Sequence, residues 1–413
     1  MKGLVGLLLV LSGNLLIDAL EVSTTIVVLP ALSADLRLAP ATAQWSLSAF
    51  ALGFGALLPF SNRMAARFGA RRIYLAALAM FAAASLAGGL TDDAAVLMVS
   101  RFVKGLCVAC TAPTGLAIIA TAFPEGPARS RAMTVYSLFG ASGFCTGLVA
   151  AGLLTEVSWR WTLLFPLPVA VVLFAFGFAL IPDAGSGSSG AGRPSLADEL
   201  LSTIRAARRP LAVAALGAAA LNGPFWAFLF LLTFRLQSQA GWSPFQAGLA
   251  LLPTGLPLAL TVPWSARLIQ RFGPRRLICA GATAPPAGYV LYMLHGGHST
   301  YLTGILPTLL LVGAGFVGAF TALHVRATAA VAERERRTVS ALYQSVVQIG
   351  GAVTLTVAVA LLPSHEALAP ANSQEVLVLL ASLSASGLVL AVWDLRPERR
   401  PVGTLPRTPQ KGQ

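Results

Sequence analysis

The chain has 413 residues, of which 56% are hydrophobic and only 11% are charged. Soluble domains carry about 25% charged residues, so this composition excludes a water-soluble globular protein and indicates a polytopic membrane protein. The formal net charge of +13 does not indicate a nucleic-acid binder, because the basic residues form short clusters between apolar segments rather than one basic face.

Long apolar runs dominate the chain. A membrane-spanning helix needs about 20 mostly apolar residues. The sequence contains twelve such runs, and we predict an all-α membrane protein with twelve transmembrane helices. In chain order the runs cover residues 4–30, 43–61, 73–91, 95–122, 133–155, 161–181, 211–234, 245–264, 277–295, 301–324, 340–363 and 375–394.

A polar stretch divides these runs into two sets of six. It contains the flexible sequence AGSGSSGAG, followed by LADELLSTIRAARR, which predicts a short amphipathic helix. We therefore predict an N-terminal six-helix bundle at 1–181, a cytoplasmic linker at 182–210, a C-terminal six-helix bundle at 211–394 and a basic cytoplasmic tail at 395–413.

The positions of Lys and Arg predict the orientation. With the N-terminus in the cytoplasm, nearly all basic residues fall in cytoplasmic connections, and the outer connections hold only Arg37 and Arg160. Cytoplasmic loops are enriched in Lys and Arg, so we expect both termini inside. The preference for arginine, with abundant Ala and Gly, indicates a GC-rich bacterial genome, and we expect a multi-pass protein of the bacterial inner (cytoplasmic) membrane.

One basic loop occurs twice. Residues 61–72 read SNRMAARFGARR, and residues 265–276 read SARLIQRFGPRR, each between two apolar runs. A loop repeated half a chain length later predicts two similar helical bundles in tandem, which is the parallel-repeat plan of a large class of transporters.

Five segments carry the motifs of one family. They are LIDALEVSTTIVVLPAL in the first run, NRMAARFGARR at 62–72, LMVSRFVKGLCVACTAPTGLAIIATAFP in the fourth run, GASGFCTGLVAAGLLTEVSWRW in the fifth run and GWSPFQAGLALLPTGLP at 241–257. In this order, and on these helices, they resemble the major facilitator superfamily, and within it the drug:proton antiporter branch. The resemblance covers nearly the whole chain.

The resemblance implies roles for particular residues. Glu21 stands at the family's first-span acid and Arg101 at its fourth-span arginine. The two loops would act in gating, through Arg67, Gly69 and Arg71 in the first copy and Arg271, Gly273 and Arg275 in the second.

The chain also departs from the family pattern. The loop's usual acid, which helps to latch the cytoplasmic gate, is replaced in both copies, and three further motif positions differ. The residues present are Ala66, Gln270, Leu148, Lys104 and Ile26.

Four charged residues lie well inside predicted spans. Asp18 and Glu21 are spaced i,i+3 on the first run, and Arg101 and Lys104 are spaced i,i+3 on the fourth, so each pair shares a helix face. Charges in the membrane are costly and usually face each other or a cavity. Because the two runs are antiparallel, we expect Glu21 to pair with Arg101, and Asp18 to pair with Lys104 about 4.5 Å further in. The four residues either couple transport to protons or form static ion pairs.

Small residues mark one side of the fifth run. Gly143 and Gly147 form a G-x-x-x-G pattern, and Gly152 continues it. Such patterns allow helices to approach closely. The resemblance places this helix at the interface between the halves, where it either moves during transport or packs statically.

Polar residues in the second half predict a substrate cavity. Asn222, with the following Gly and Pro, should interrupt the seventh run before Trp226, and broken helices are tolerated where they line a cavity. Gln344 and Gln348 share a face of the eleventh run beside Tyr343, and either contact substrate or form interhelical hydrogen bonds.

The sequence gives no sign of metal or cofactor chemistry. Cys107 and Cys110 form a C-x-x-C within an apolar run, where small buried residues are the expectation. His295 and His298 lack neighbouring ligands for a metal. There is no nucleotide-binding or catalytic motif, so we expect a non-enzymatic secondary transporter with no cofactor, driven by a proton gradient.

These features predict a proton-coupled transporter that exports a small lipophilic compound by alternating access. Its expected partners are the substrate, protons and the lipid bilayer, without nucleic acid, and we expect a monomer. Two alternatives remain open: a proton symporter that imports a metabolite, and a membrane protein of this fold that has lost transport.

Overall fold

The computed structural model describes most of the chain as helix. The described residues are 2–182, 196–261, 264–295, 300–329, 331–362 and 374–394. The predicted Gly/Ser linker sequence and the basic tail lie outside them.

The described residues form helices and no β-strand. The N-terminal half comprises α1 (Lys2–Asp35), α2 (Pro40–Ala43), α3 (Trp45–Phe68), α4 (Ala70–Leu90), α5 (Ala94–Ala122), α6 (Pro127–Val157), α7 (Trp159–Leu164) and α8 (Pro166–Leu180). The C-terminal half comprises α9 (Leu196–Phe234), η1 (Arg235–Gln239), α10 (Pro244–Thr261), α11 (Ser265–His295), η4 (Tyr301–Ile305), α12 (Leu306–Gly315), η5 (Phe316–Phe320), α13 (Thr321–Ala329), η6 (Glu333–Glu335), α14 (Arg336–Ala360) and α15 (Gln374–Asp394).

Ten helical segments of the described chain are long and apolar enough to cross a membrane. The runs at 245–264 and 375–394 correspond to α10 and α15. The prediction of an all-α membrane protein is therefore confirmed, whereas the count of twelve spans and their orientation stay predictions.

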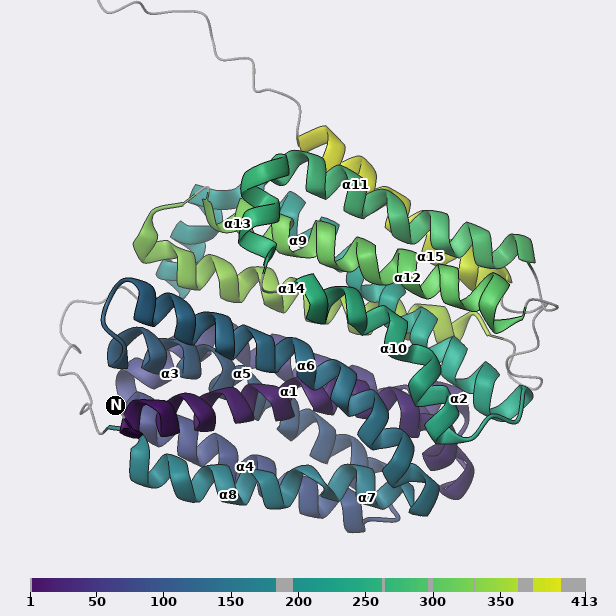
Figure 1. The fold of residues 1–413 in the computed structure, drawn as a ribbon, viewed down its shortest axis with the longest axis horizontal. Coiled ribbons are helices and arrows are strands. Elements are labelled where there is room, and N and C mark those ends of the chain that lie inside the picture. The colour runs from purple at the N-terminus through teal and green to yellow at the C-terminus, as the bar shows by residue number, and fades with distance from the viewer. Residues whose placement is uncertain are drawn as a thin grey trace, which may run out of the picture.

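The helices of the two halves lie on opposite sides of a common boundary (Figure 1). Across this boundary α3 packs against α14, and α6 packs against α10. A large apolar cluster also crosses it, joining Ile26 and Leu148 of the N-terminal half to Phe225 and Leu251 of the C-terminal half. The boundary is thus a packed apolar interface.

Glycines decide how closely the helices cross. A Cβ atom on Gly53 of α3 would lie 2.2 Å from the Phe102 carbonyl oxygen, and one on Gly105 of α5 would lie 2.1 Å from the Phe50 carbonyl oxygen. Backbone therefore packs on backbone, as small residues permit in membrane helices. Helix α1 contacts both of these helices.

The repeated loop adopts the same turn in both copies. Gly69 has φ 91° and separates α3 from α4, and Gly273 has φ 75° and breaks α11 at the equivalent place. Residues other than glycine rarely adopt a positive φ, because their Cβ atom clashes with the backbone there. This explains the glycine in each copy.

Helix α9 corrects two predictions. The amphipathic helix and the seventh run form one continuous helix of 39 residues, and Asn222, Gly223 and Pro224 do not interrupt it. Pro224 removes a single N–H donor, while close packing on α14 supports the helix: a Cβ on Gly223 would lie 2.3 Å from Thr354 Oγ1. Asn222 Nδ2 also donates to the Val347 carbonyl at 3.3 Å.

We expect Gly105→Ala to destabilise the protein, because its methyl group would force α3 and α5 apart. Overpacking of this kind lowers the free energy of unfolding by about 1–3 kcal/mol. Unfolding in detergent measures the effect, and Gly3→Ala is the control, since nothing lies within 4 Å of a Cβ there. Equal stability of the two variants would contradict the role of Gly105.

Candidate functional site

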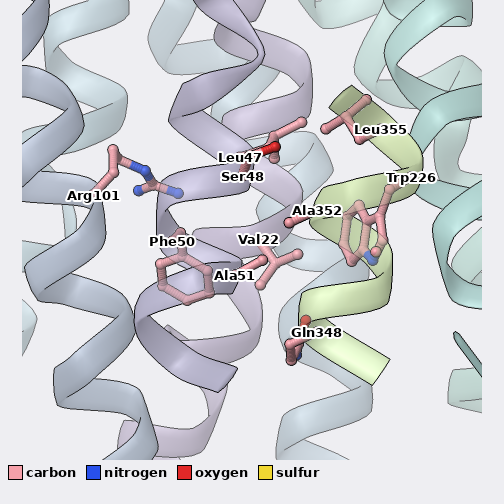
Figure 2. A pocket seen from close by; sticks show the side chains of 11 residues that line it. Val22, Leu47, Ser48, Phe50, Ala51, Arg101, Trp226, Gln348, Ala352 and Leu355 are labelled. Atoms are coloured by element: carbon pink, nitrogen blue, oxygen red, sulfur yellow. The ribbon is translucent and has the colours of Figure 1, made fainter. Parts of the chain in front are cut away.

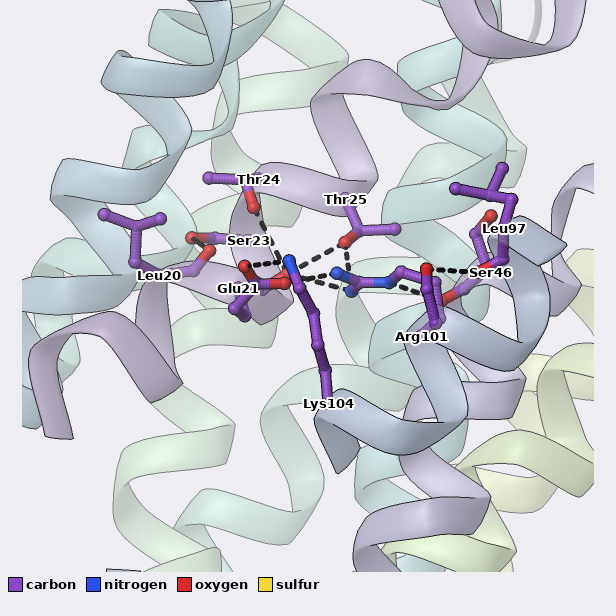
Figure 3. A network of polar contacts seen from close by, with 10 residues as sticks. Leu20, Glu21, Ser23, Thr24, Thr25, Ser46, Leu97, Arg101 and Lys104 are labelled. Atoms are coloured by element: carbon purple, nitrogen blue, oxygen red, sulfur yellow. Dashed lines mark hydrogen bonds and ion pairs between the residues drawn. The ribbon is translucent and has the colours of Figure 1, made fainter. Parts of the chain in front are cut away.

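A buried ionic network joins the first and fourth predicted spans (Figure 3). Arg101 Nη1 donates to Glu21 Oε2, and Lys104 Nζ donates to Glu21 Oε1 at 2.7 Å. Each of these three side chains is only 1% exposed. One carboxylate therefore holds two cations, one on each oxygen, and the predicted pairing of Glu21 with Arg101 is confirmed.

Arg101 makes further contacts that join three helices. Its Nη2 donates to Thr25 Oγ1 and to the Glu21 carbonyl at 3.2 Å on α1, and its Nε donates to the Ser46 carbonyl on α3 at 3.1 Å. Hydrogen bonds to a buried guanidinium offset the loss of its hydration. Arg101 thus fixes the positions of α1, α3 and α5 together.

Aromatic rings cover both cations. The Arg101 guanidinium lies 5.2 Å from the centroid of the Phe50 ring, and Lys104 Nζ lies 5.1 Å from that of Phe81. The electron-rich face of an aromatic ring attracts a cation, and more strongly where water is excluded. The network is therefore shielded by apolar groups that also stabilise it.

Asp18 does not pair with Lys104, contrary to the sequence-based prediction. Asp18 Oδ2 accepts from Thr111 Oγ1 at 3.0 Å and from Asn14 Nδ2 at 3.1 Å. Thr111 lies about two turns beyond Lys104 on α5, so Asp18 sits deeper than the simple antiparallel register places it. The long side chain of Lys104 reaches Glu21 instead, where Arg101 leaves Oε1 available.

A small cavity lies at the boundary between the halves, beside Arg101. Figure 2 shows Phe50 and Trp226 on opposite sides of it, with Val22 and Ala352 between them. Its volume is about 30 Å³. The lining residues are Val22, Leu47, Ser48, Phe50, Ala51, Arg101, Trp226, Gln348, Gly351, Ala352 and Leu355.

The cavity is far smaller than the pockets of about 300–1,000 Å³ that hold drug-sized ligands. Towards the end of the molecule that carries the Gly69 turn, Leu58, Ala109 and Ala341 form a buried apolar cluster across the boundary. Helices of the two halves are thus in contact between the cavity and this end of the molecule.

Polar contacts close the boundary towards its other end. Gln237 Nε2 donates to the Val27 carbonyl at 2.9 Å, and the Phe245 N–H donates to Glu156 Oε1 at 3.3 Å. Each bond joins one half of the chain to the other. The structure is therefore a conformer in which both ends of the boundary are in contact.

The predicted cavity residues divide into two groups. Trp226 and Gln348 line the cavity, and Asn222 Oδ1 accepts from Trp226 Nε1 at 3.0 Å, which fixes the indole. Tyr343 is fully buried in the C-terminal half and donates to the Phe320 carbonyl at 3.2 Å, so it faces the core rather than the cavity. Gln344 is half-buried and does not line the cavity.

The glycines of α6 pack against two different helices. A Cβ on Gly143 would lie 2.5 Å from the Leu16 carbonyl oxygen, and one on Gly147 would lie 2.1 Å from Ser23 Oγ, both on α1. A Cβ on Gly152 would lie 2.7 Å from Phe245 Cα on α10. Only Gly152 of the three therefore packs across the boundary.

The arginines of the repeated loops lie at one end of the helices. Arg71 Nη2 donates to the Phe178 carbonyl on α8, and its guanidinium covers the Phe178 ring. Arg67 and Arg271 each lie over the phenylalanine that follows in sequence. The side chain of Arg275, like that of Gln270, lies outside the description. The gating role of these loops stays a prediction.

The described residues contain no group of three or more potential metal ligands. Cys107 and Cys110 are buried and free, as expected for small core residues. His295 Nδ1 lies 2.9 Å from the Leu291 carbonyl oxygen, and His298 is outside the described residues.

Sequence reasoning does not single out Thr25, Ser46 or Phe50, although all three contact Arg101. Thr25 offers a signal, because it is a polar residue one turn after Glu21. The Ser46 contact uses a backbone carbonyl, and Phe50 is one of many apolar residues in its run. No pattern in the sequence marks these two.

The ionic network predicts how substitutions of its residues change the free energy of unfolding. Glu21→Gln leaves two buried cations without an anion, and breaking a buried pair in this way costs about 3–5 kcal/mol of stability. In double-mutant cycles measured by unfolding, Lys104→Gln should couple more strongly to Glu21→Gln than to Asp18→Asn. Stronger coupling of Lys104 to Asp18 would contradict the observed pairing.

Known proteins resemble this chain in both fold and sequence. The nucleoside transporter NupG superposes with a TM-score of 0.74 at 12% identity, covering 96% of this chain and 100% of that one. The human organic anion transporter TETRAN superposes with a TM-score of 0.68 at 20% identity, covering 94% of this chain and 99% of that one. At these identities the likeness shows the fold alone.

Closer relatives are found by sequence. The puromycin resistance protein of Streptomyces alboniger is 33% identical over 404 residues, which cover 84% of this chain and 79% of that protein. The cephamycin export protein CmcT of Amycolatopsis lactamdurans is 31% identical over 415 residues, covering 85% and 84%. The family model of the Major Facilitator Superfamily matches residues 11–355. This membrane protein therefore belongs to the major facilitator superfamily, a family of transporters and not of enzymes.

Proposed function

We propose that the protein is a proton-coupled exporter of small lipophilic compounds that works by alternating access. The observation that carries this proposal is the acid–base network of Glu21, Arg101 and Lys104, buried beside a cavity between the two halves. Intramembrane charges of this kind mark ion pathways and coupling sites, because their burial is otherwise costly.

The relatives support export rather than import. The proteins similar to this chain include a puromycin resistance protein, a cephamycin export protein and, at 25% identity over 412 residues, a tetracenomycin C resistance and export protein of Streptomyces glaucescens. The same direction of transport is proposed for this chain, with an antibiotic or another lipophilic compound as substrate.

Coupling would arise from the charge balance of the network. On α1, Glu21 binds both cations of α5, and Asp18 lies one turn away beside Thr111. Binding or release of a proton there changes the net buried charge, and the conformer that solvates the cluster better is then favoured. The bundles at 1–181 and 211–394 would rock about the boundary, opening the closed cavity to one side at a time.

The lining of the cavity indicates the chemistry of the substrate. Trp226, Phe50 and several aliphatic side chains supply apolar surface, and Gln348 and Ser48 supply polar atoms. Arg101 is the charged lining residue, and its guanidinium is already engaged by Glu21. A neutral or zwitterionic compound with an aromatic or aliphatic body suits this lining better than a cation.

Twelve spans with both termini in the cytoplasm, in the inner membrane of a bacterium, would place the basic connections on the inner side. The transporter would act as a monomer without a cofactor, using the proton gradient as its energy source.

Uptake into inside-out membrane vesicles tests the proposal. With the vesicle interior acidic, we expect accumulation of at least one of puromycin, cephamycin and tetracenomycin C, and a protonophore should abolish it. Vesicles from cells that lack the protein are the control. Uptake only into right-side-out vesicles would show import, and accumulation that a protonophore leaves unchanged would overturn proton coupling.

The cavity lining gives a second prediction. Trp226→Ala should raise the KM for an apolar substrate about tenfold or more, because burial of an aromatic side chain against a ligand contributes on the order of 1.5–3 kcal/mol. Trp161→Ala is the control, since Trp161 is 54% exposed and lies away from the cavity. Transport by the Trp226 variant with unchanged KM would place the substrate elsewhere.

A further inference from the structure

Asp18 is a second buried acid that the ionic network does not use. It lies one turn from Glu21 on α1 and is 5% exposed. Its hydrogen-bond donors are the Thr111 hydroxyl and the Asn14 amide, and both act on Oδ2. Both partners are neutral, so no cation compensates a negative charge on Asp18 directly.

Glu21 has the opposite surroundings. Each of its carboxylate oxygens accepts from a different cation, Arg101 or Lys104. A proton on Glu21 would leave both cations buried without an anion, which is a large penalty inside a protein. The network therefore holds Glu21 in the ionised form.

The titratable groups that interact electrostatically with Asp18 are Tyr74 on α4, Cys107 on α5, Tyr136 on α6 and, on its own helix, Glu21, whose charge has the same sign. None of these four groups is a cation. Tyr136 donates its proton to the Ala112 carbonyl at 3.0 Å, so this hydrogen is already engaged by another acceptor. Lys104, the nearest cation on α5, is bound to Glu21.

We propose that Asp18 is the residue that binds and releases the transported proton, whereas Glu21 stays ionised as a fixed anion between Arg101 and Lys104. This inference rests on the proposed proton-coupled function and deepens it. One proton from the outer side binds an Asp18 carboxylate oxygen, and the same proton leaves to the cytoplasm. Thr111 can keep its hydrogen bond to Oδ2 in both states, because Oδ1 is available to carry the proton.

Proton release from Asp18 has a structural consequence. Ionised Asp18 competes with Glu21 for Lys104, whose ammonium group sits on a flexible four-carbon stem. Lys104 thereby provides a movable cation between two acids that lie one turn apart, while Arg101 keeps Glu21 in place. The state of Asp18 is then transmitted to the contact between α1 and α5.

Infrared difference spectroscopy of the purified full-length protein tests the assignment without a substrate. Between acidic and alkaline buffer, wild type should show the C=O stretching band of one buried carboxylic acid. The band should be absent in Asp18→Asn and present in Glu21→Gln and in Asp35→Asn, the control acid, which is 55% exposed. A band lost in Glu21→Gln but kept in Asp18→Asn would overturn the proposal, as would the absence of any buried carboxyl band in wild type.

Transport assays distinguish a loss of proton coupling from a loss of substrate binding. In proteoliposomes, Asp18→Asn should lose gradient-driven accumulation but keep substrate exchange at equal pH, because exchange needs no net proton movement. Glu21→Gln should lose both, since it disrupts the whole network. Accumulation by Asp18→Asn at the wild-type level would overturn the proposal.

Two further results keep the inference distinct from the proposed function. If wild type shows no gradient-driven transport but the infrared band follows Asp18, the proposed function fails while the protonation site stands. If Asp18→Asn does not fold, Thr111→Val keeps the acid and removes its donor, and it should shift the pH at which the band titrates. An unshifted band in that variant would overturn the assignment.

Discussion

The burial of Arg101 is the constraint on which the rest of the N-terminal half depends. A guanidinium that is 1% exposed needs an anion and several acceptors, and these come from α1 and α3. The α3 acceptor lies within reach where Gly53 and Gly105 allow α3 and α5 to cross backbone to backbone. The glycines and the charged residues therefore act together. Close helix packing excludes water, and the ionic network supplies the hydrogen bonds that the buried polar groups no longer make with water.

The same constraint shapes the boundary between the halves. Arg101 lines the central cavity while it holds Glu21, so the ionic network and the space between the halves share one side chain. The boundary closes over this space through apolar contacts near Leu58 and through polar bonds from Gln237 and Phe245. These contacts must separate before a drug-sized molecule can enter, so any transport by this protein requires motion of one half against the other.

The two halves repeat a backbone but differ in chemistry. Gly69 and Gly273 make the same turn in both. The buried acids and bases, however, lie on α1 and α5 of the N-terminal half, whereas α9 and α14 present Trp226 and Gln348 to the cavity. A repeated scaffold thus carries charge on one side of the boundary and a mainly apolar, hydrogen-bonding surface on the other.

The sequence by itself determined the membrane class, the helical runs, the turn of the repeated loop and the pairing of Glu21 with Arg101, because these follow from hydropathy, from glycine and from helix periodicity. Only the tertiary structure decided that Lys104 also binds Glu21, that Asp18 lies beside Thr111, that Tyr343 faces the core and that α9 continues through Pro224. Periodicity gives the face on which a residue lies. Three other features depend on how the chain packs: the relative depth of two helices, the reach of a long side chain and the support that a neighbouring helix gives. The sequence pattern does not reveal these features.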